Sequence, residues 1–356
     1  MTAHELSAPG VGEVCWGIVG CGAVTEVKSG PAFQKVPGSR LVAVMRRSRD
    51  RAADYARRHG VPRWYDDAER LIADPEVNAV YIATPPGSHL EYALLACAYQ
   101  KPVYVEKPMA RNHAECMRMA HAFQSANVPL FVAYYRRALP RFLKVRELIA
   151  ERVLGRITGV SYRFAASHDR NLAAGTPLPW RLRPEESGGG LLLDVGCHTL
   201  DVLDWLLGPL ESVSGTAVNV ASLYDVEDNV VVQFRAASGA LGAARWNFAA
   251  CNRADQIVLE GEEGELSLPT FGDDPIELRR GSAVERFAIA NPAHIQGPMI
   301  ANVVADLRGA ARCESTGVSA ARTQAVMDTV LDGYYGGRNR AFWESAASWP
   351  GRPARV

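Results

Sequence analysis

The sequence lacks the features that mark several common classes of protein. Its seven cysteines are an odd number at scattered positions without a CxxC pair, which argues against a disulfide framework or a zinc site and suits a reducing compartment. The 39 basic side chains balance 39 acidic ones, so no net charge points to nucleic acid or a membrane surface. No apolar run approaches the roughly 18 residues of a membrane span, and the N-terminus lacks the basic start and apolar core of a secretory signal. We therefore expect a soluble, cytoplasmic protein with a flexible tail over residues 1–12.

A glycine turn near the N-terminus predicts a nucleotide-binding fold. The sequence VCWGIVGCGAV joins a short apolar strand to a turn and then to a helix-like stretch. Gly20 permits the turn, and Gly22 lets a pyrophosphate approach the backbone at the start of the helix. Thr25 stands where a third glycine or alanine is usual, and such a glycine pair alone is weak evidence. The residues expected to bind at this turn are Gly20, Cys21, Gly22, Ala23 and Val24.

Further strands alternate with helices in the first half of the chain. RLVAVM, NAVYIATPP and PVYVEKP read as buried strands, with helices between them, which is typical of a parallel, doubly wound α/β sheet. Ligands of such sheets bind beyond the carboxyl ends of the strands, where Arg46, Thr84 and Lys107 lie together with the glycine turn. Because 356 residues exceed what one core supports, we expect two domains, a Rossmann domain over 13–131 and a substrate domain over 132–356.

The end of the second strand carries information about the dinucleotide. An acidic residue normally stands there to bind the ribose hydroxyls of NAD, whereas this chain has Arg46, Arg47 and Ser48. Guanidinium groups match a phosphate bidentately, so NADP(H) is favoured over NAD(H), which stays possible. The alternative is that both arginines are solvated loop charges.

The second half of the chain predicts an α+β domain. Eight candidate strands recur, and hairpin sequences such as AASGA and GEEGE separate some of them. Strands joined by hairpins favour a mostly antiparallel sheet, and we expect a last helix near residues 298–310. The strands are ITGVSYRF, SVSGTAVNV, NVVVQFRA, ALGAARWNF, QIVLEGEEG, ELSLP, PIELRR and ERFAIA.

A polar stripe crosses one strongly apolar helix of this half. Within GGGLLLDVGCHTLD, residues Asp194, His198 and Asp201 fall on one face at helical spacing, while the other faces are apolar. Such a stripe lines a pocket, faces water or holds a metal, but no other cluster with ligand spacing accompanies it, so we predict no metal. In a pocket, His198 would donate or accept a proton beside a carboxylate.

With GCGAV, ATPPGSH, VEKP and GGGLLLDVGCH in this order, the chain resembles the glucose-fructose oxidoreductase, inositol dehydrogenase and rhizopine-catabolism (Gfo/Idh/MocA) family of NAD(P)-dependent oxidoreductases over nearly its full length. The resemblance implies that Lys107, Asp194 and His198 form the catalytic group. It leaves Asp201 in a structural role. It also implies cofactor contacts from the ATPP turn, from the glutamate before the lysine and from a Trp-Arg pair, which are here Thr84, Pro85, Pro86, His89, Glu106, Lys107, Trp180 and Arg181.

The resemblance also indicates how substrate and partner copies are bound. Tyr135 and Arg136 correspond to positions that face the substrate together with Asp194 and His198, although the arginine could equally be surface and the tyrosine core. The resemblance further implies that the second sheet is open and mostly antiparallel, with helices on one face. Family members commonly pair through its uncovered face, which implies a homodimer or homotetramer.

These observations predict an NADPH-dependent reductase of a keto group in a sugar, cyclitol or related polyhydroxylated compound. His198 would protonate the carbonyl oxygen while Lys107 binds it, although Lys107 could itself be the acid. A close alternative is an NAD-dependent sugar or inositol dehydrogenase. A non-catalytic NADP-binding regulator is an alternative of another class, and a pure scaffold would leave the glycine turn and Lys107 without purpose. The substrate itself cannot be read from the sequence.

Overall fold

The computed structural model describes residues 12–167, 177–339 and 341–353. The chain divides into two compact units, and each is made of segments that are not contiguous in sequence. The first unit comprises Met1–Ala110, Glu115–Leu139 and Pro292–Ala321, and the second comprises Arg111–Ala114, Pro140–Asn291 and Arg322–Val356.

The first unit is built on a parallel six-stranded sheet with the order β3-β2-β1-β4-β5-β6. This is the strand order of a dinucleotide-binding Rossmann fold. Every residue of β1 and β4 is buried, as expected for strands covered on both faces. The strands are β1 (Val14–Val19), β2 (Ser39–Met45), β3 (Arg63–Tyr65), β4 (Ala79–Ile82), β5 (Val103–Val105) and β6 (Leu130–Val132).

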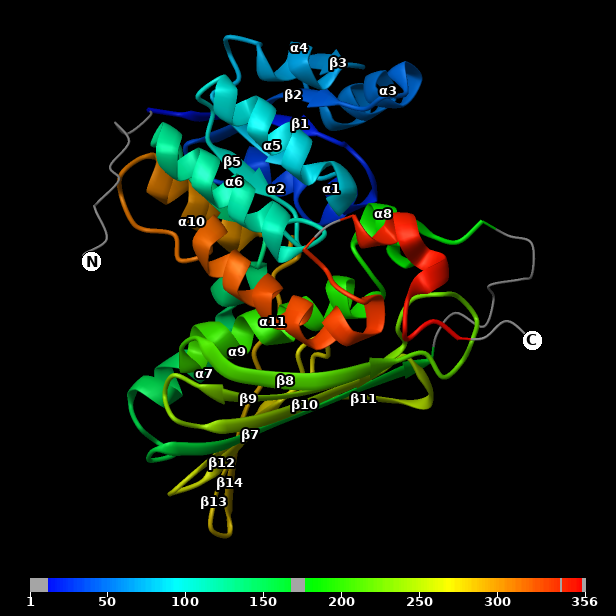
Figure 1. The fold of residues 1–356 in the computed structure, drawn as a ribbon. Coiled ribbons are helices and arrows are strands. Elements are labelled where there is room, and N and C mark those ends of the chain that lie inside the picture. Colours follow the sequence, from blue (N-terminus) through cyan, green and yellow to red (C-terminus); the bar gives the residue numbers. More distant parts are fainter. Residues whose placement is uncertain (1–11, 168–176, 340, 354–356) are drawn as a thin grey trace. The chain divides into compact units, whose positions relative to one another are not determined.

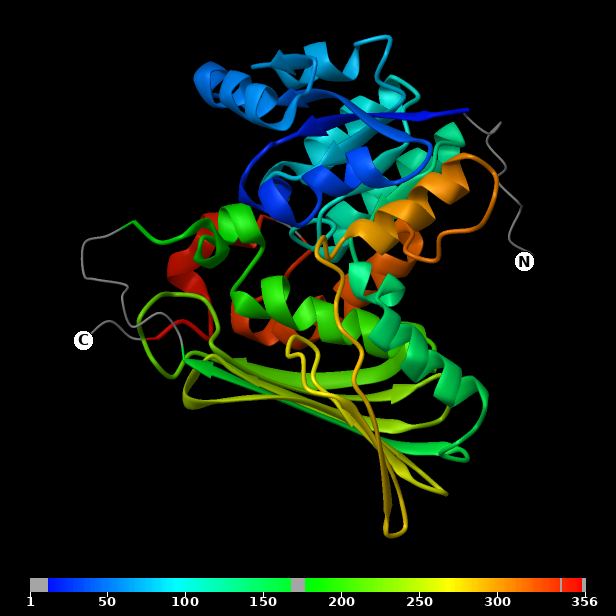
Figure 2. The same cartoon turned by 180° about the vertical axis from the view of Figure 1, so that it is seen from behind.

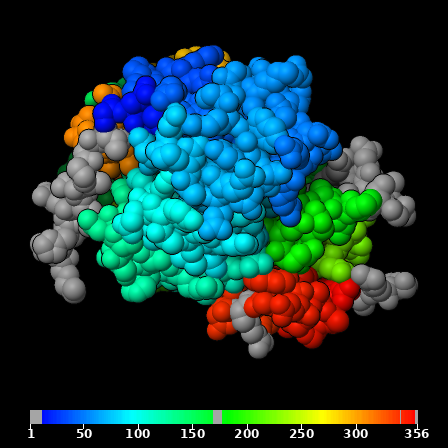
Figure 3. Space-filling view, turned by 90° about the horizontal axis from the view of Figure 1, so that it is seen from above, coloured from blue at the N-terminus to red at the C-terminus, as the bar shows by residue number. Residues whose placement is uncertain are grey.

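Helices cover both faces of this sheet, with α1 and α2 on one side and α5 and α6 on the other (Figures 1 and 2). Figure 3 shows one face of the unit, where atoms coloured blue and cyan lie together. The helical elements are α1 (Ala23–Val27), α2 (Gly30–Lys35), α3 (Arg49–His59), α4 (Ala68–Ile72), η1 (Pro86–Ser88), α5 (His89–Ala98), α6 (His113–Ala126, mainly in this unit), η2 (Tyr135–Ala138) and α10 (Gly297–Leu307).

A late segment of the chain returns to the first unit. Pro292–Ala321 packs there, although it lies within residues 132–356 of the sequence-based division. Helix α10 contacts α2. The Val132 amide donates to the Ser315 carbonyl at 2.9 Å, and the Ser315 hydroxyl donates to the Val132 carbonyl at 2.7 Å. The returning segment therefore extends the hydrogen bonding of the last strand of the Rossmann sheet.

The second unit contains an eight-stranded mixed sheet with the order β14-β13-β12-β11-β7-β10-β9-β8. All neighbouring strands are antiparallel except β10 and β7, so the prediction of a mostly antiparallel sheet is confirmed. The strands are β7 (Ile157–Ser167), β8 (Leu210–Val218), β9 (Asn229–Ala236), β10 (Leu241–Asn247), β11 (Ala249–Gly261), β12 (Glu265–Leu268), β13 (Ile276–Arg280) and β14 (Ala283–Phe287).

Helices α7 and α9 lie on one face of the eight-stranded sheet (Figures 1 and 2). Along β9 buried and exposed residues alternate, which is the pattern of a strand with one covered face. The remaining helical elements are α7 (Pro140–Ala150), η3 (Trp180–Leu182), α8 (Pro184–Ser187), the π-helix η4 (Leu192–Gly196), α9 (Cys197–Leu207), α11 (Gly317–Tyr335, which begins in the first unit) and η5 (Phe342–Ser348). Helix α11 was not predicted from the sequence.

Candidate functional site

The glycine turn between β1 and α1 has the geometry that a dinucleotide requires. Gly20 has a φ of +93°, and a Cβ atom there would lie 2.6 Å from Cγ2 of Thr84, so only glycine fits. A Cβ on Gly22 would meet nothing closer than 3.8 Å, which leaves its backbone open to a ligand. Thr25 is fully buried and donates its hydroxyl to the Gly22 carbonyl at 2.8 Å, so it closes the turn where a small residue was expected.

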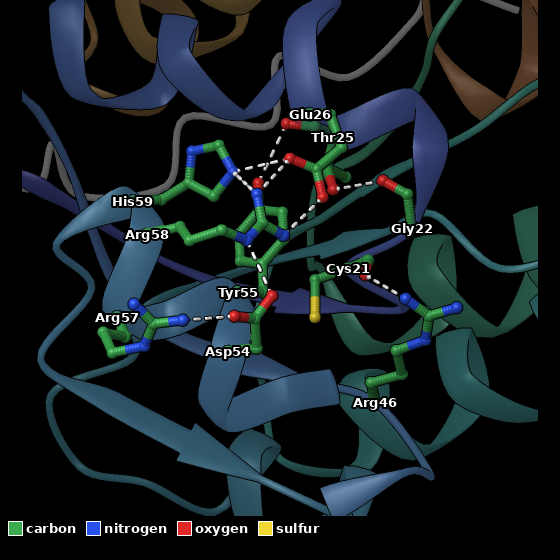
Figure 4. Close-up of polar contacts among 10 residues, drawn as sticks. All are labelled: Cys21, Gly22, Thr25, Glu26, Arg46, Asp54, Tyr55, Arg57, Arg58 and His59. Carbon is green, nitrogen blue, oxygen red and sulfur yellow. Dashed lines mark hydrogen bonds and ion pairs between the residues drawn. The ribbon is translucent and has the colours of Figure 1, made fainter. Parts of the chain in front are cut away.

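Cys21 contributes only its backbone to this turn, because its side chain is fully buried. Burial raises the pKa of the Cys21 thiol to about 11, and the charge of Arg46 opposes this shift only in part. The Arg46 guanidinium donates to the Cys21 carbonyl at 3.4 Å (Figure 4). The first arginine after β2 therefore lies beside the glycine turn.

A hollow of about 380 Å³ lies beyond the carboxyl ends of β1, β2 and β4. Three arginines contribute to its wall, and none of its described lining residues is acidic. The lining residues are Gly20, Gly22, Met45, Arg46, Arg47, Ser48, Arg51, Ala83, Thr84, Pro85 and Tyr92. The structure thus brings most of the predicted cofactor residues of the first three strand ends together, and it adds Arg51 and Tyr92, which the sequence did not indicate. Arg51 lies in the first turn of α3, which begins directly after Ser48, and this closeness to the predicted strand end could have revealed it.

Helices α1 and α3, which begin at the rim of the hollow, are fastened to each other (Figure 4). Glu26 binds Arg58 through two contacts of 2.8 Å and His59 through one of 2.8 Å. The hydrogen bond from Arg58 is the main cause that lowers the pKa of Glu26 to about 2. Tyr55 adds a buried hydrogen bond to the Thr25 carbonyl at 2.9 Å. These contacts fix the separation of two walls of the hollow.

The ATPP turn is tied to the loop that carries Lys107. His89 is fully buried, with Nε2 2.7 Å from the Thr84 carbonyl oxygen and Nδ1 3.2 Å from those of Pro108 and Met109. Burial is the main cause that lowers the pKa of His89, while the hydrogen bonds to these backbone carbonyls oppose the shift. His89 therefore connects the backbone of the ATPP turn with that of the loop after Lys107.

Lys107 follows β5 directly, and Glu106 turns its side chain into the interior of the first unit. Glu106 is 7% exposed, and its Oε1 accepts hydrogen bonds from Tyr81 at 2.5 Å and from Gln296 at 2.6 Å. Its Oε2 accepts the Lys107 amide at 3.2 Å. The glutamate therefore fixes the backbone that presents the lysine.

Tyr135 and Arg136, the predicted substrate residues of the first unit, lie in η2 and are both buried. The Arg136 guanidinium lies 5.0 Å from the Tyr135 ring centroid, a cation–π contact. Arg137 is also buried and donates to the Glu314 carbonyl at 3.0 Å. The surface interpretation of these arginines is therefore wrong.

In the second unit, the GGG sequence is a tight turn that leads into the predicted helix. Gly188 and Gly189 have φ values of +85° and +154°, and a Cβ on Gly190 would lie 2.5 Å from the Glu227 carbonyl oxygen. The helix then begins with a π-helical turn over Leu192–Gly196 before α9 continues as a regular α-helix. Such π-turns are frequent at functional sites. Asp194 lies in the π-turn and His198 in the first turn of α9.

The polar stripe on this helix is buried, so the solvent-facing interpretation is wrong for His198 and Asp201, which are 5% and 0% exposed. Asp194 accepts the Nε–H of Arg181 at 2.7 Å, and the Arg181 guanidinium lies 4.4 Å from the Trp180 ring centroid. The Trp-Arg pair and the first acid of the stripe are thus joined within one unit.

Aromatic and hydroxyl groups surround the rest of the stripe. The His198 ring meets that of Phe271 edge to face at 5.8 Å, and Asp201 accepts a hydrogen bond from Thr323 at 3.4 Å. Asp255 holds the Phe271 loop in place, because it accepts the amides of Thr270, Phe271 and Gly272 at 3.0, 2.6 and 3.2 Å.

The Glu227 carboxylate holds the GGG turn through a hydrogen bond from the Gly190 amide. It is fully buried, accepts the Gly190 amide at 2.9 Å and binds the Tyr335 hydroxyl. Arg338 continues this network by donating to the carbonyls of Gly188 and Arg111 at 2.8 and 2.9 Å. The sequence did not single out Glu227, Asp255 or Gln296, because their partners are distant along the chain.

Across the described ranges, no group of three or more histidine, cysteine, aspartate or glutamate side chains could hold a metal ion. Among the described helices, none combines the length and apolar character that a membrane crossing requires.

Taken together, the Rossmann sheet, the glycine turn and the hollow beside it define a dinucleotide-binding protein of the oxidoreductase class. Residues 14–134 match the profile of the oxidoreductase family with an NAD-binding Rossmann fold, and residues 142–267 match the GFO/IDH/MocA C-terminal domain. The chain belongs to the Gfo/Idh/MocA family of oxidoreductases, as the sequence predicted.

Relatives support this membership. Oxidoreductase P35 of Formosa agariphila is 41% identical over 81% of this chain and 89% of its own. Levoglucosan dehydrogenase of Pseudarthrobacter phenanthrenivorans is 29% identical over 69% of this chain and 70% of its own. The solved structure of an aldose-aldose oxidoreductase from Caulobacter crescentus shares the fold, with a TM-score of 0.79, 22% identity and coverage of 90% of this chain and 98% of that one.

Proposed function

We propose that the protein is an NADP(H)-dependent oxidoreductase that reduces the keto group of a sugar, a cyclitol or a related polyhydroxylated compound. The substrate class is supported by the 29% identical relative named levoglucosan dehydrogenase, which acts on an anhydrosugar. The choice of NADP(H) is carried by one observation, the three arginines and Ser48 in the wall of the hollow.

The residues of the first unit suit the phosphorylated dinucleotide in several ways. The turn at Gly20 and Gly22 leaves room where a pyrophosphate would approach the backbone, and Thr84 and Pro85 form the opposite wall. Arg46, Arg47 and Arg51 offer guanidinium groups that match a 2′-phosphate bidentately and stack on an adenine ring. An acidic residue at this strand end would instead repel the phosphate.

The catalytic residues would handle one proton and hold the substrate, while the bound dinucleotide supplies or accepts the hydride. In the reducing direction His198 donates its proton to the carbonyl oxygen, and Lys107 donates a hydrogen bond to the same oxygen. Asp194, oriented by Arg181, binds a substrate hydroxyl. Tyr135 and Arg136 contribute further substrate contacts, and Asp201 supports α9 from the interior.

The test is a titration of the protein with NADPH and with NADH, in which the fluorescence of the seven tryptophans reports binding. One charge-assisted hydrogen bond to a phosphate contributes about 1.5–3 kcal/mol, so NADPH should bind about tenfold to 150-fold more tightly. Arg46→Asp should remove this preference. Arg57→Asp is the control for the charge change, because Arg57 lies on the neighbouring helix α3 with a 76% exposed side chain and does not line the hollow.

Turnover is then measured with a panel of ketosugars and cyclitols at the nicotinamide absorbance. Reduction of at least one member with NADPH supports the proposal. Equal binding of NADH, with little effect of Arg46→Asp, would favour the NAD-dependent sugar or inositol dehydrogenase, whose cofactor the family profile names. Tight binding without turnover across the panel would favour the regulator.

We also propose that copies of the chain associate through the face of the eight-stranded sheet opposite α7 and α9. Val231 and Leu241 are 41% and 67% exposed, and neighbouring strands β9 and β10 carry them. Burial of these two apolar side chains against a partner would stabilise the association. Light scattering after gel filtration should show a dimer or tetramer, and a monomer at micromolar concentration would contradict this. The seven free thiols support a cytoplasmic location.

A further inference from the structure

A buried polar network lies beneath the end of β5 and reaches Lys107 through the backbone. Its members are Tyr81, Tyr104 and Gln296, all fully buried, and Glu106. Tyr81 and Gln296 both donate to the same oxygen of Glu106, at 2.5 and 2.6 Å. Tyr104 donates to the Gln296 side-chain oxygen at 3.2 Å. Both hydrogen bonds to this oxygen therefore come from side chains that are buried from water.

The donors of this network keep their protons. Burial raises the pKa of Tyr81 and of Tyr104 well above 10, and the charge of Glu106 acts in the same direction. Gln296 does not titrate, and Tyr104 orients its amide so that the nitrogen faces Glu106. The two tyrosines therefore remain hydrogen-bond donors across the physiological pH range.

The same network is connected to the helices of the glycine turn. The Tyr81 hydroxyl lies 3.2 Å from Oγ of Ser29, which in turn donates to the Val24 carbonyl of α1 at 3.3 Å. The backbone amide of Gln296 donates to the Lys28 carbonyl at 3.2 Å. Gln296 is also the N-cap residue of α10, and its backbone carbonyl accepts the Ile300 amide at 2.9 Å. The late return of the chain to the first unit therefore places one glutamine between the dinucleotide turn and the lysine loop.

We propose that Gln296 and Tyr81 are positioning residues that act through Glu106 to hold the Lys107 backbone in its working position. This inference rests on the proposed function, in which Lys107 binds the reacting oxygen. Without Gln296, Glu106 loses one of two donors on Oε1 and can turn away from the Lys107 amide. A displacement of the catalytic group by about 1 Å can cost on the order of 100-fold in rate.

The test compares Gln296→Leu and Tyr81→Phe with the wild type. Ser39→Ala is the matched control, because it also removes a buried hydroxyl of this sheet, at the opposite end of its strand, where Ser39 accepts from Trp16 at 3.1 Å and donates to Phe33 at 2.7 Å. Tyr81→Phe removes a single oxygen, so it keeps the proposal testable if Gln296→Leu does not fold.

The first readout needs neither cofactor nor substrate. The chain has five lysines, at positions 28, 35, 101, 107 and 144, so trace labelling with acetic anhydride and peptide mass spectrometry resolves each amine. Lys101 is the internal reference, because its ammonium donates to the carbonyls of Asp74 and Val77 at 2.7 and 2.6 Å. We expect the pH profile of Lys107 labelling relative to Lys101 to shift in both variants and not in Ser39→Ala.

The second readout is steady-state kinetics with a substrate from the panel. We expect kcat to fall about tenfold or more in both variants, while NADPH affinity and melting temperature change no more than in Ser39→Ala. An unchanged Lys107 profile and unchanged kcat would overturn the inference. A shifted Lys107 profile in a protein that reduces no member of the panel would support the positioning role and refute the proposed function, so the two failures are distinguishable.

Discussion

Removal of the Glu227 carboxyl should disrupt the turn that leads to Asp194 and His198. Glu227 is fully buried and accepts hydrogen bonds from the Gly190 amide and the Tyr335 hydroxyl. In Glu227→Ala both donors lose their acceptor in the interior, at a cost of about 1–3 kcal/mol each. We therefore expect a loss of about 2–6 kcal/mol in the stability of the second unit, and a fall in its melting temperature on the order of 10 °C.

Glu227→Gln distinguishes the contribution of the hydrogen bonds to stability from that of the carboxylate charge. Glutamine keeps an acceptor for the Gly190 amide at nearly the same volume, so its cost should stay below about 1.5 kcal/mol. Burial is the main cause that raises the pKa of Glu227 above 4.5, while the Tyr335 hydroxyl and Arg338 oppose it. An acid with a raised pKa stabilises the fold fully below its unfolded pKa and loses this contribution as the pH rises through its folded pKa. The wild type should therefore lose stability relative to Glu227→Gln as the pH is raised from 4.5.

The assay combines thermal unfolding between pH 4.5 and 8 with hydrogen exchange of the amides over residues 190–196. Glu227→Ala should accelerate exchange there, and Glu227→Gln should leave it close to that of the wild type. The reasoning is refuted if alanine costs less than about 1 kcal/mol, if glutamine costs as much as alanine, or if the wild type gains stability relative to glutamine as the pH rises.

Two further substitutions test other parts of the site. Gly20→Ala places a Cβ 2.6 Å from Cγ2 of Thr84 and should weaken NADPH binding at least about tenfold by calorimetry, whereas Gly60→Ala, with a similar positive φ of +64° and nothing within 4 Å, should cost stability but not affinity. Equal affinity losses would contradict the steric argument. Asp255→Ala should accelerate amide exchange at Phe271, because three backbone amides lose their acceptor. Its total cost should stay at about 1–3 kcal/mol, because these hydrogen bonds are exposed or half-buried and water can replace part of them. Unchanged exchange at this loop would show that the carboxylate does not hold it.

Local sequence patterns were sufficient to predict most strands of both sheets, but the three-residue strands β3 and β6 of the first sheet were not predicted. The apolar runs of β1, β2, β4 and β5 are buried on both faces, and the eight strands of the second unit were each recognised from alternation and turn residues. The placement of the glycine turn and of the arginines after β2 around one hollow could also be predicted, because the carboxyl ends of parallel strands converge.

Side chains that act over long sequence separations could not be predicted in this way. Glu227 reaches Gly190 across 37 positions, and Gln296 reaches Glu106 across 190. Neither residue belongs to a local motif, and a lone Glu or Gln near a strand or helix end reads as ordinary surface. The π-turn at Leu192–Gly196 was missed for a different reason, since helical periodicity does not distinguish one wider turn inside an apolar helix.

The central claim is that this chain moves a hydride between NADP(H) and the carbinol carbon of a polyhydroxylated compound with the help of Lys107 and His198. The most direct measurement is a reduction with NADPH carrying deuterium at the transferred C4 position, followed by mass spectrometry of the product. The wild type should add one deuterium to the carbon that bore the keto group. His198→Ala should slow this transfer about 100-fold to 10,000-fold while it leaves NADPH affinity nearly unchanged. Tight NADPH binding without deuterium in any product, or transfer at the wild-type rate by His198→Ala, would contradict the account.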